Sequence, residues 1–223
     1  MESGPLATKV LFHIGPVPVS DAVVTTWGLM VVLTVVCYVG LRRRSVVAGP
    51  FQAMLEILVE TIESQVAAVI DRDAWPYLPL LGTLFIFLVL ANILAVVPGL
   101  KPPTAHIETP AALALVVFFS VHFFGIRSHG LRSYLHRYIR PNVLMLPLNV
   151  LSEITRTFSL MVRLFGNIMS HELVIGIVVL LAGLLVPVPF MLLGLLIGII
   201  QAFIFTILAT VFIAAAIGAV DIE

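Results

Sequence analysis

Charged residues are scarce in this chain. Only 11% of its 223 residues are Asp, Glu, Lys or Arg, whereas 61% are hydrophobic, and the mean hydropathy is +1.16. Because a soluble globular domain carries about 25% charged residues, that class is excluded. Neither sign is in excess, since twelve basic residues balance twelve acidic ones, and this excludes the basic surface of a nucleic-acid-binding protein. The composition predicts a polytopic membrane protein, with the lipid bilayer as its surroundings.

Cysteine is almost absent too. Cys37 is the only one, so the chain has neither a disulfide framework nor a cysteine-based metal site. His171-Glu172 begins like the H-E-x-x-H motif of a zinc peptidase, but the fifth position is Ile175, and the second zinc ligand is missing. No phosphate-binding loop of the form G-x-x-x-x-G-K-[ST] occurs. We therefore expect no metal and no cofactor.

Long apolar runs divide the chain into segments. A helix needs about 20 apolar residues to cross the roughly 30 Å of hydrocarbon. The sequence predicts an all-α fold in one membrane domain, 1–223, with about five membrane-embedded helices. The expected segments are an outer tail at 1–21, spans at 22–41, 78–97 and 109–126, a basic cytoplasmic loop at 127–142, and two long helices at 144–186 and 190–220, which Pro187-Val188-Pro189 separates.

Residues 50–70 have a different pattern. Apolar side chains recur there at helical spacing, while acidic side chains share the opposite face, which predicts an amphipathic helix rather than a span. Its acidic face should meet water or another protein, because anionic lipid would repel it. The apolar positions are Phe51, Met54, Leu55, Leu58, Ile62, Val66 and Val69, and the acidic positions are Glu56, Glu60 and Glu63.

The basic residues between the spans predict the orientation. Their numbers alternate as 1, 4, 1 and 4 along the chain. By the positive-inside rule the N-terminus lies outside, and both arginine-rich loops and the C-terminus lie in the cytoplasm. The four groups are Lys9; Arg42, Arg43, Arg44 and Arg72; Lys101; and Arg127, Arg132, Arg137 and Arg140.

Five ionisable residues cluster on the apolar segment 144–186. A charge at the bilayer centre costs about 2.5–3.5 kcal/mol, so such residues face a partner or a wet cavity. Glu153 and Arg156 are three residues apart and could pair locally. Arg163 lies about 13–15 Å along the helix from both Glu153 and Glu172, which is too far for direct pairing. Its partner is either an acid on another chain or a group of the last helix such as Gln201 or a carbonyl. The five residues are Glu153, Arg156, Arg163, His171 and Glu172.

The positions of these residues predict two aqueous pockets. Glu153 lies toward the cytoplasmic end of its helix, and His171 with Glu172 toward the outer end. Carboxylates and imidazole relay protons, whereas the arginine between them stays protonated and blocks passage. This pattern is typical of an ion translocator with a moving carrier. A stand-alone secondary transporter is the alternative, but it would show an internal inverted repeat, and we see none.

Other polar or small positions have simpler interpretations. Gly194 and Gly198 form a G-x-x-x-G pattern, which favours close helix packing. His122 is expected to be a packing residue whose ring is satisfied. His106 and Glu108 are expected in a polar loop at the outer surface.

Three groups of residues form a recognisable pattern in the segment around Arg163, in the last helix and in the second span. They are Ser159-Leu160, Arg163-Leu164-Phe165-Gly166-Asn167 and Glu172-Leu173, then Gln201-Ala202-Phe203-Ile204-Phe205, and Leu81-Gly82-Thr83-Leu84-Phe85 with Asn92 and Pro98-Gly99. Through these residues the sequence resembles subunit a of F-type ATP synthases from about Pro50 onward, most strongly around Arg163.

The resemblance implies a stator in a bacterial inner membrane, not catalytic by itself. Its partners would be the ring of c subunits, the b subunits and the lipid bilayer, and the coupling ion would be a proton or sodium. The resemblance implies that Arg163 faces the ring carboxylate and that Asn167, Glu172 and Gln201 line the outer half-channel. It also implies that the last two helices form a long tilted hairpin against the ring.

The sequence departs from this family at three sites. One is Thr157, where relatives often have proline, so the helix should be less kinked. Many relatives carry an ionisable residue seven positions before the glutamine of the last helix, where this chain has Gly194. We hypothesise that His171 supplies the missing protonatable group. A loop that reads Thr-Ala-Asp in many relatives reads Thr104-Ala105-His106 here, so the acid of that loop is absent.

Overall fold

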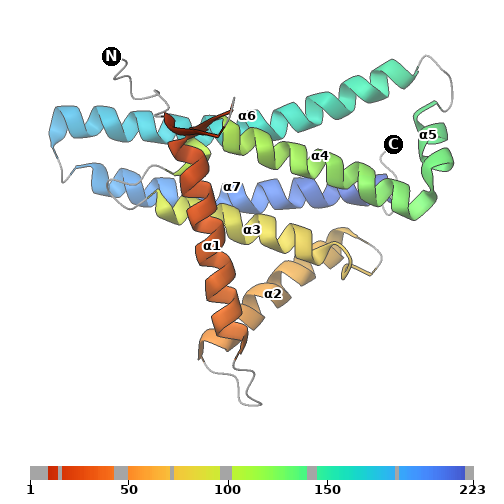
Figure 1. The fold of residues 1–223 in the computed structure, drawn as a ribbon, viewed down its shortest axis with the longest axis horizontal. Helices are drawn as coiled ribbons and strands as arrows, with labels where there is room; N and C mark the ends of the chain where they lie inside the picture. Colours follow the sequence, from red (N-terminus) through yellow and green to blue (C-terminus); the bar gives the residue numbers. More distant parts are fainter. Residues whose placement is uncertain are drawn as a thin grey trace.

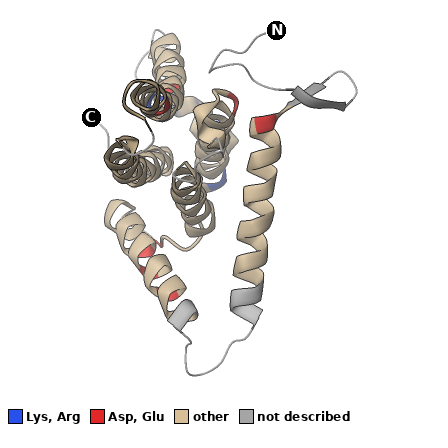
Figure 2. Cartoon of the chain, turned by 90° about the vertical axis from the view of Figure 1, so that its left-hand side faces the viewer, with Lys and Arg blue, Asp and Glu red and all other residues tan. Residues whose placement is uncertain are grey.

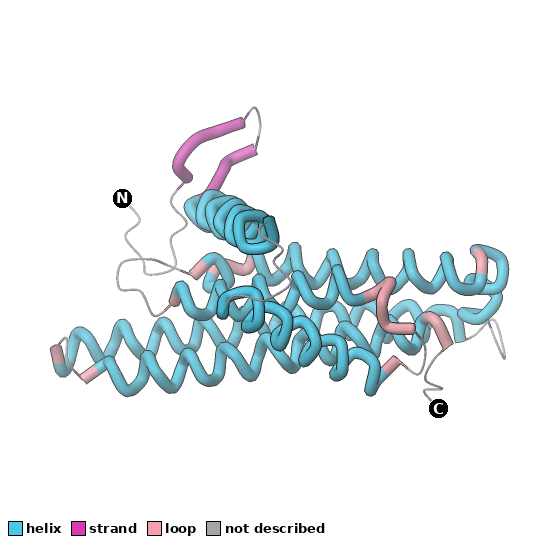
Figure 3. Tube along the Cα trace, turned by 90° about the horizontal axis from the view of Figure 1, so that it is seen from below, coloured by secondary structure: helices cyan, strands magenta, loops and turns pink. Residues whose placement is uncertain are grey.

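The structure is a computed structural model that describes residues 10–14, 17–42, 50–70, 73–95, 102–139, 145–183 and 186–218. α-Helices make up nearly all of this part of the chain (Figures 1 and 3), and the expected all-α polytopic fold is confirmed. The helices are α1 (Asp21–Arg42), α2 (Pro50–Val69), α3 (Leu78–Leu94), α4 (Glu108–His129), α5 (Leu131–Ile139), α6 (Met145–Ala182) and α7 (Pro187–Ala216). A β-hairpin of β1 (Val10–Ile14) and β2 (Val17–Ser20) precedes α1, and a short 3-10 turn, η1 (Pro103–Ala105), precedes α4.

Four of these helices are long and apolar enough to cross a bilayer, namely α1, α4, α6 and α7. The apolar helix α3 has 17 residues and is shorter than the others. With 38 residues in α6 and 30 in α7, the last two helices exceed the length of a perpendicular span. The chain is therefore a multi-pass membrane protein whose last two helices form a long hairpin (Figure 1).

Helices α3, α4, α6 and α7 pack together, and their contacts form the core. In a membrane such packing depends on close van der Waals contact rather than on the hydrophobic effect. Small side chains on α7, including Ala202 and Ala209, are fully buried and allow its neighbours to approach. α1 lies at one side of this bundle (Figure 2), and half of its described side chains are exposed. The largest core residues are Leu81 and Leu88 of α3, Leu164 of α6, and Phe205 and Ile213 of α7.

Two polar contacts attach the amino end of α1 to the amino end of α4. The Ser20 hydroxyl donates a hydrogen bond of 2.5 Å to Glu108 Oε2, and the hydroxyls of Thr26 and Thr109 lie 3.5 Å apart. Glu108 is the first residue of α4 and not part of a loop as predicted. A carboxylate is favourable there, because the amino end of a helix carries a partial positive charge.

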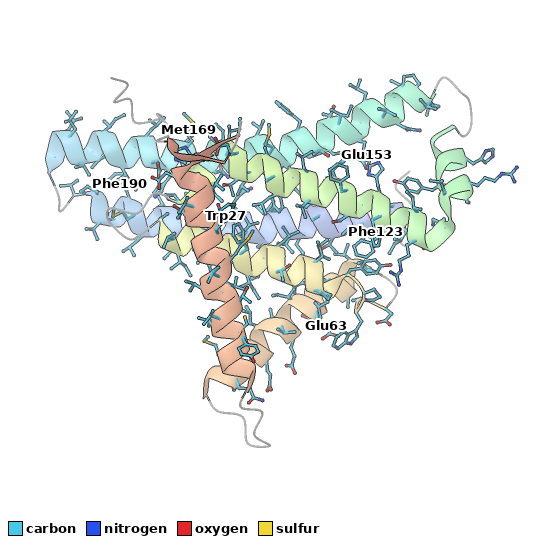
Figure 4. All side chains as sticks on the ribbon, in the orientation of Figure 1. Trp27, Glu63, Phe123, Glu153, Met169 and Phe190 are labelled. Atoms are coloured by element: carbon cyan, nitrogen blue, oxygen red, sulfur yellow. The ribbon has the colours of Figure 1, made fainter. Side chains whose placement is uncertain are left out.

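α2 is amphipathic, as the sequence predicted. Ile62 and Val66 are buried against the bundle, whereas Glu56 and Glu60 are exposed and Glu63 is half-buried. The acidic positions stand out on this helix in Figure 2, and Figure 4 shows the side chain of Glu63. Not every predicted apolar contact forms: Met54 is 57% exposed.

The predicted basic loop at 127–142 instead contains the helix α5. Gly130 ends α4 with a positive φ of 77°, and its carbonyl accepts a hydrogen bond of 3.0 Å from the Tyr134 amide, so α5 begins at once. Tyr134 is 5% exposed and packs against α4. On α4, His122 Nδ1 lies 2.8 Å from the Phe118 carbonyl, which confirms His122 as a satisfied packing residue.

Some predicted features lie outside the described residues. They include the beginning of the outer tail, the ends of two predicted segments and several of the counted basic residues. These positions are 1–9, Arg43, Arg44, Arg72, Val97, Pro98, Gly99, Lys101, Arg140, Leu144 and Val220.

Candidate ion-translocation site

Arg163 lies on the exposed side of α6. Leu160 and Leu164 face the core, with 2% and 0% of their surface exposed, whereas Arg163 between them is exposed. Within the described part of the chain, Arg163 takes part in no hydrogen bond or ion pair. The predicted alternative partner, Gln201, is engaged elsewhere, because its Oε1 accepts from Asn167. The guanidinium is therefore open to a group on another molecule.

A groove of about 470 Å³ runs beside Arg163 between α6 and α7. Polar side chains from successive turns of α6 line one wall, and Leu208 and Phe212 of α7 lie opposite. The Arg156 guanidinium sits over the Phe212 ring, 5.5 Å from its centroid. This contact is a cation–π interaction. The polar lining residues are Ser152, Thr155, Arg156, Ser159 and Arg163.

Glu153 lines a separate, small cavity of about 20 Å³ between α4, α6 and α7. Arg156 borders this cavity as well as the groove, and Thr157 and Phe118 complete the nearby wall. Figure 4 shows Glu153 on the half of α6 that leads to α5, and Met169 on the opposite half. The local proximity of Glu153 and Arg156 predicted from their spacing therefore occurs at the boundary between two cavities.

A second polar cluster lies on the other side of Arg163. Asn167 is one turn away on α6, and its Nδ2 donates a hydrogen bond of 2.7 Å to Gln201 Oε1 on α7. Both residues border a cavity of about 20 Å³, together with Asn92 and His171. Gln201 is only 3% exposed, and its Nε2 has no partner among the described groups. Since a cavity of this size holds one water, a water is the natural acceptor for that Nε2.

Two glycines of α7 make room for polar side chains from two different helices. A Cβ on Gly194 would overlap the imidazole ring of His171, which comes from α6. A Cβ on Gly198 would lie 2.8 Å from Cβ and Cγ of Asn92, which comes from α3. The Asn92 amide donates a hydrogen bond of 2.8 Å to the Gly198 carbonyl. The predicted close packing at this G-x-x-x-G pattern is confirmed, with each glycine serving its own neighbour.

The structure groups the predicted residues into two sets. Arg163, Arg156 and Ser159 share the groove, whereas the cavity around the second cluster brings together the predicted residues Asn167, His171, Gly194, Gly198 and Gln201. Glu172 is half-buried beside His171 but does not line that cavity.

Sequence reasoning missed Asn92, Ser152 and Thr155 as site residues. A signal was present for each. Asn92 is the one amide in an otherwise apolar helix, Leu78–Leu94. Ser152 and Thr155 lie eleven and eight residues before Arg163, which places them near its side of the helix.

Known proteins match this chain over most of its length. The family model described as ATP synthase A chain matches residues 23–214, so the likeness begins earlier than the predicted Pro50. "ATP synthase subunit a 2" of Bradyrhizobium sp. (strain BTAi1) is 60% identical over 220 residues, which is 99% of each chain. The protein of the same name from Pelobacter propionicus is 46% identical over 214 residues, or 96% of this chain and 94% of the relative.

A more distant relative extends the comparison. "ATP synthase subunit a" of Moorella thermoacetica is 40% identical over 204 residues, covering 92% of this chain and 94% of the relative. The family match and the relatives each cover more than four fifths of the chain. The chain therefore belongs to the ATP synthase subunit a family.

Proposed function

We propose that this chain is the non-catalytic stator of the membrane sector of a rotary ATP synthase, and that it provides two ion half-channels to a rotating ring of c subunits. The observation that carries the proposal is the exposed Arg163, which lies between two polar clusters and has no partner in the described chain. The names of the relatives, which call them subunits, argue against a stand-alone transporter.

The second polar cluster is suited to the outer half-channel. Asn167, His171 and Gln201 converge on one cavity, and Glu172 follows His171 on α6. Imidazole and carboxylate groups exchange protons, and amides orient water between them. The ring of His171 occupies the space over Gly194. This supports the hypothesis that His171 supplies the protonatable group that many relatives carry at the glycine position.

The groove on the other side of Arg163 is suited to the inner half-channel. Hydroxyls of Ser152, Thr155 and Ser159 line it up to Arg163, and hydroxyl groups both donate and accept hydrogen bonds. Glu153 lies behind Arg156 in the adjacent small cavity, where it can take part in proton exchange. In this assignment Arg156 is a structural residue held over Phe212.

The surface around Arg163 is suited to close contact with another helix. Three of the residues one or two turns away on its side of α6 are small, namely Ser159, Gly166 and Ser170. A Cβ on Gly166 would meet no atom within 4 Å. In membranes, small residues allow helices to pack backbone to backbone. A helix of the c ring could therefore bring a carboxyl group up to the guanidinium.

The cation gives rotation a direction. A ring carboxyl is neutral while it faces lipid, because a charge is costly there. Beside the Arg163 guanidinium its ionised form is favoured by about 1.4–4 kcal/mol. The ion therefore leaves the ring carboxyl at Arg163. A ring carboxyl that still holds its ion cannot move past Arg163 in the reverse direction. The membrane potential supplies about 2.3 kcal/mol per charge per 100 mV. This energy is comparable with the stabilisation of the ionised carboxyl, so the potential can bias each step of the ring.

We also propose the orientation that the basic residues predict, with the N-terminus outside and the C-terminus in the cytoplasm of a bacterial inner membrane. In Figure 1, α5, the start of α6 and the end of α7 lie together, while the end of α6 and the start of α7 lie at the opposite end. This arrangement supports a single cytoplasmic side, because the arginines of α5 belong to that end. The b subunits and the c ring would be the partners in the membrane.

The test is Arg163→Ala in the complete complex, reconstituted in vesicles. We expect ATP-driven proton pumping to be lost while the complex still assembles, because nothing then forces the ring carboxyl to ionise. Arg156→Ala is the matched control: it removes a cation from the same groove and should retain pumping. Normal proton-driven ATP synthesis by Arg163→Ala would refute the assignment.

A further inference from the structure

The corner between α4 and α5 is joined by two backbone hydrogen bonds and by the packing of one aromatic ring. The Gly130 amide donates a hydrogen bond of 2.8 Å to the Ile126 carbonyl, and the Gly130 carbonyl accepts one from Tyr134. A positive φ of 77° at Gly130 suits glycine and turns the chain sharply. The Tyr134 ring fills the space over Gly125, where a Cβ would overlap it. α5 is therefore held against the end of α4 in a fixed position.

This corner carries several positive charges close together. Arg127 and His129 lie in the last turn of α4, Arg132 lies in the first turn of α5, and all three are exposed. The sequence has no Asp or Glu between Glu108 and Glu153. Cations are favourable at the carboxyl end of α4, but the amino end of α5 is itself positive. Arg132 therefore adds to a local positive potential, which an anion bound at the corner would lower.

The length of α4 and the aromatic residues near its end are compatible with a corner at the depth of lipid headgroups. The 22 residues of α4 extend about 33 Å, close to the hydrocarbon thickness of about 30 Å. Beside it, Tyr77 packs edge-on against Phe124 with ring centroids 4.8 Å apart, and nearby Trp75 is 66% exposed. Exposed aromatic residues of this kind are typical of the membrane–water interface.

From these observations we infer that the α4–α5 corner is a binding site for the headgroup of an anionic phospholipid. Arg127 and Arg132 hold the phosphate, and arginine suits this role because its planar fork matches phosphate oxygens. Leu131, between them, is 59% exposed and enters the acyl chains. An exposed leucine among arginines fits a lipid, with its charged head and apolar tail, better than the acidic surface of a protein.

Photolabelling of the complete complex tests this inference. The complex is reconstituted in phosphatidylcholine vesicles that contain a trace of photoreactive phosphatidylglycerol or photoreactive phosphatidylcholine. Labelling is then measured on the peptide that covers residues 127–136. One arginine near the surface strengthens attraction to anionic lipid about fivefold. We expect phosphatidylglycerol to label the peptide at least fivefold more than phosphatidylcholine, and Arg127→Gln/Arg132→Gln to abolish the difference.

The control is Arg42→Gln/Arg43→Gln, which removes the same charge from the other arginine-rich loop. It should leave labelling of the 127–136 peptide unchanged. Equal labelling by both lipids would overturn the inference. So would an equal loss of labelling in the control variant, because general attraction to the leaflet would then explain the result. Crosslinking of this peptide mainly to another subunit would identify a protein as the occupant and would also overturn it.

Discussion

Replacing Gly198 by alanine should force α3 and α7 apart. The new Cβ would lie 2.8 Å from two carbons of Asn92, about 0.6 Å short of the 3.4 Å at which ordinary contact begins. Asn92 Cβ and the α7 backbone belong to packed helices, so neither can move by itself. The two helices must therefore separate by the missing distance, about 0.6 Å. The hydrogen bond from Asn92 to the Gly198 carbonyl, now 2.8 Å, would lengthen to roughly 3.4 Å, where such bonds are weak.

The expected cost is about 1.5–4.5 kcal/mol of unfolding free energy, from which helix propensity recovers about 0.5–1 kcal/mol. Overpacking contributes about 1–3 kcal/mol, and the weakened buried hydrogen bond about 0.5–1.5 kcal/mol. Because Gln201 is less than one turn away, proton pumping should fall as well. The assays are unfolding of the purified chain in mixed micelles and ATP-driven pumping by the reconstituted complex.

Gly176→Ala is the matched control for this change. A Cβ on Gly176 would meet no atom within 4 Å, so the substitution should stabilise α6 by about 0.5–1 kcal/mol through helix propensity. The double variant Asn92→Gly/Gly198→Ala should be more stable than the two single effects predict, since it removes the overlapping atoms. If Gly198→Ala were as stable and as active as Gly176→Ala, the packing argument would be wrong.

Three further variants test the ion path in reconstituted vesicles. Arg163→Lys should fail in coupled pumping, because an ammonium can lose its proton in a dry interface; wild-type coupling would show that any cation suffices. Glu172→Gln should slow proton transport without preventing assembly, and an unchanged rate would remove Glu172 from the path. His171→Ala should reduce the transport rate, whereas His171→Gly/Gly194→His should recover part of it by returning the imidazole to the same cavity from α7. Full transport by His171→Ala would exclude a role for His171.

The sequence predicted the features that depend on local spacing. Apolar runs gave the long helices, and periodicity gave the buried positions Ile62 and Val66 of α2. The distances along one helix correctly predicted that Arg163 could not pair with an acid on α6. These predictions succeed because 3.6 residues per turn and 1.5 Å per residue fix positions within a helix, whatever surrounds it.

Contacts between distant segments could not be predicted in the same way. The bond from Ser20 to Glu108 joins residues 88 apart, and nothing near either residue indicates the other. The fit of His171 over Gly194 depends on how far α6 and α7 are shifted along each other, which the spacing within one helix does not determine. α5 was missed because four of its nine residues are Arg, His or Ser. Its helix also depends on the turn at Gly130 and on the burial of Tyr134.

The attachment of α1 to α4 has a consequence for biogenesis. Its four side chains, Ser20, Thr26, Glu108 and Thr109, all precede α6 in the chain. During synthesis, these two helices can therefore dock before either long helix of the hairpin leaves the ribosome. The hairpin carries Arg163, whose charge is unfavourable in the bilayer. It then enters a membrane in which α1 and α4 are already packed together.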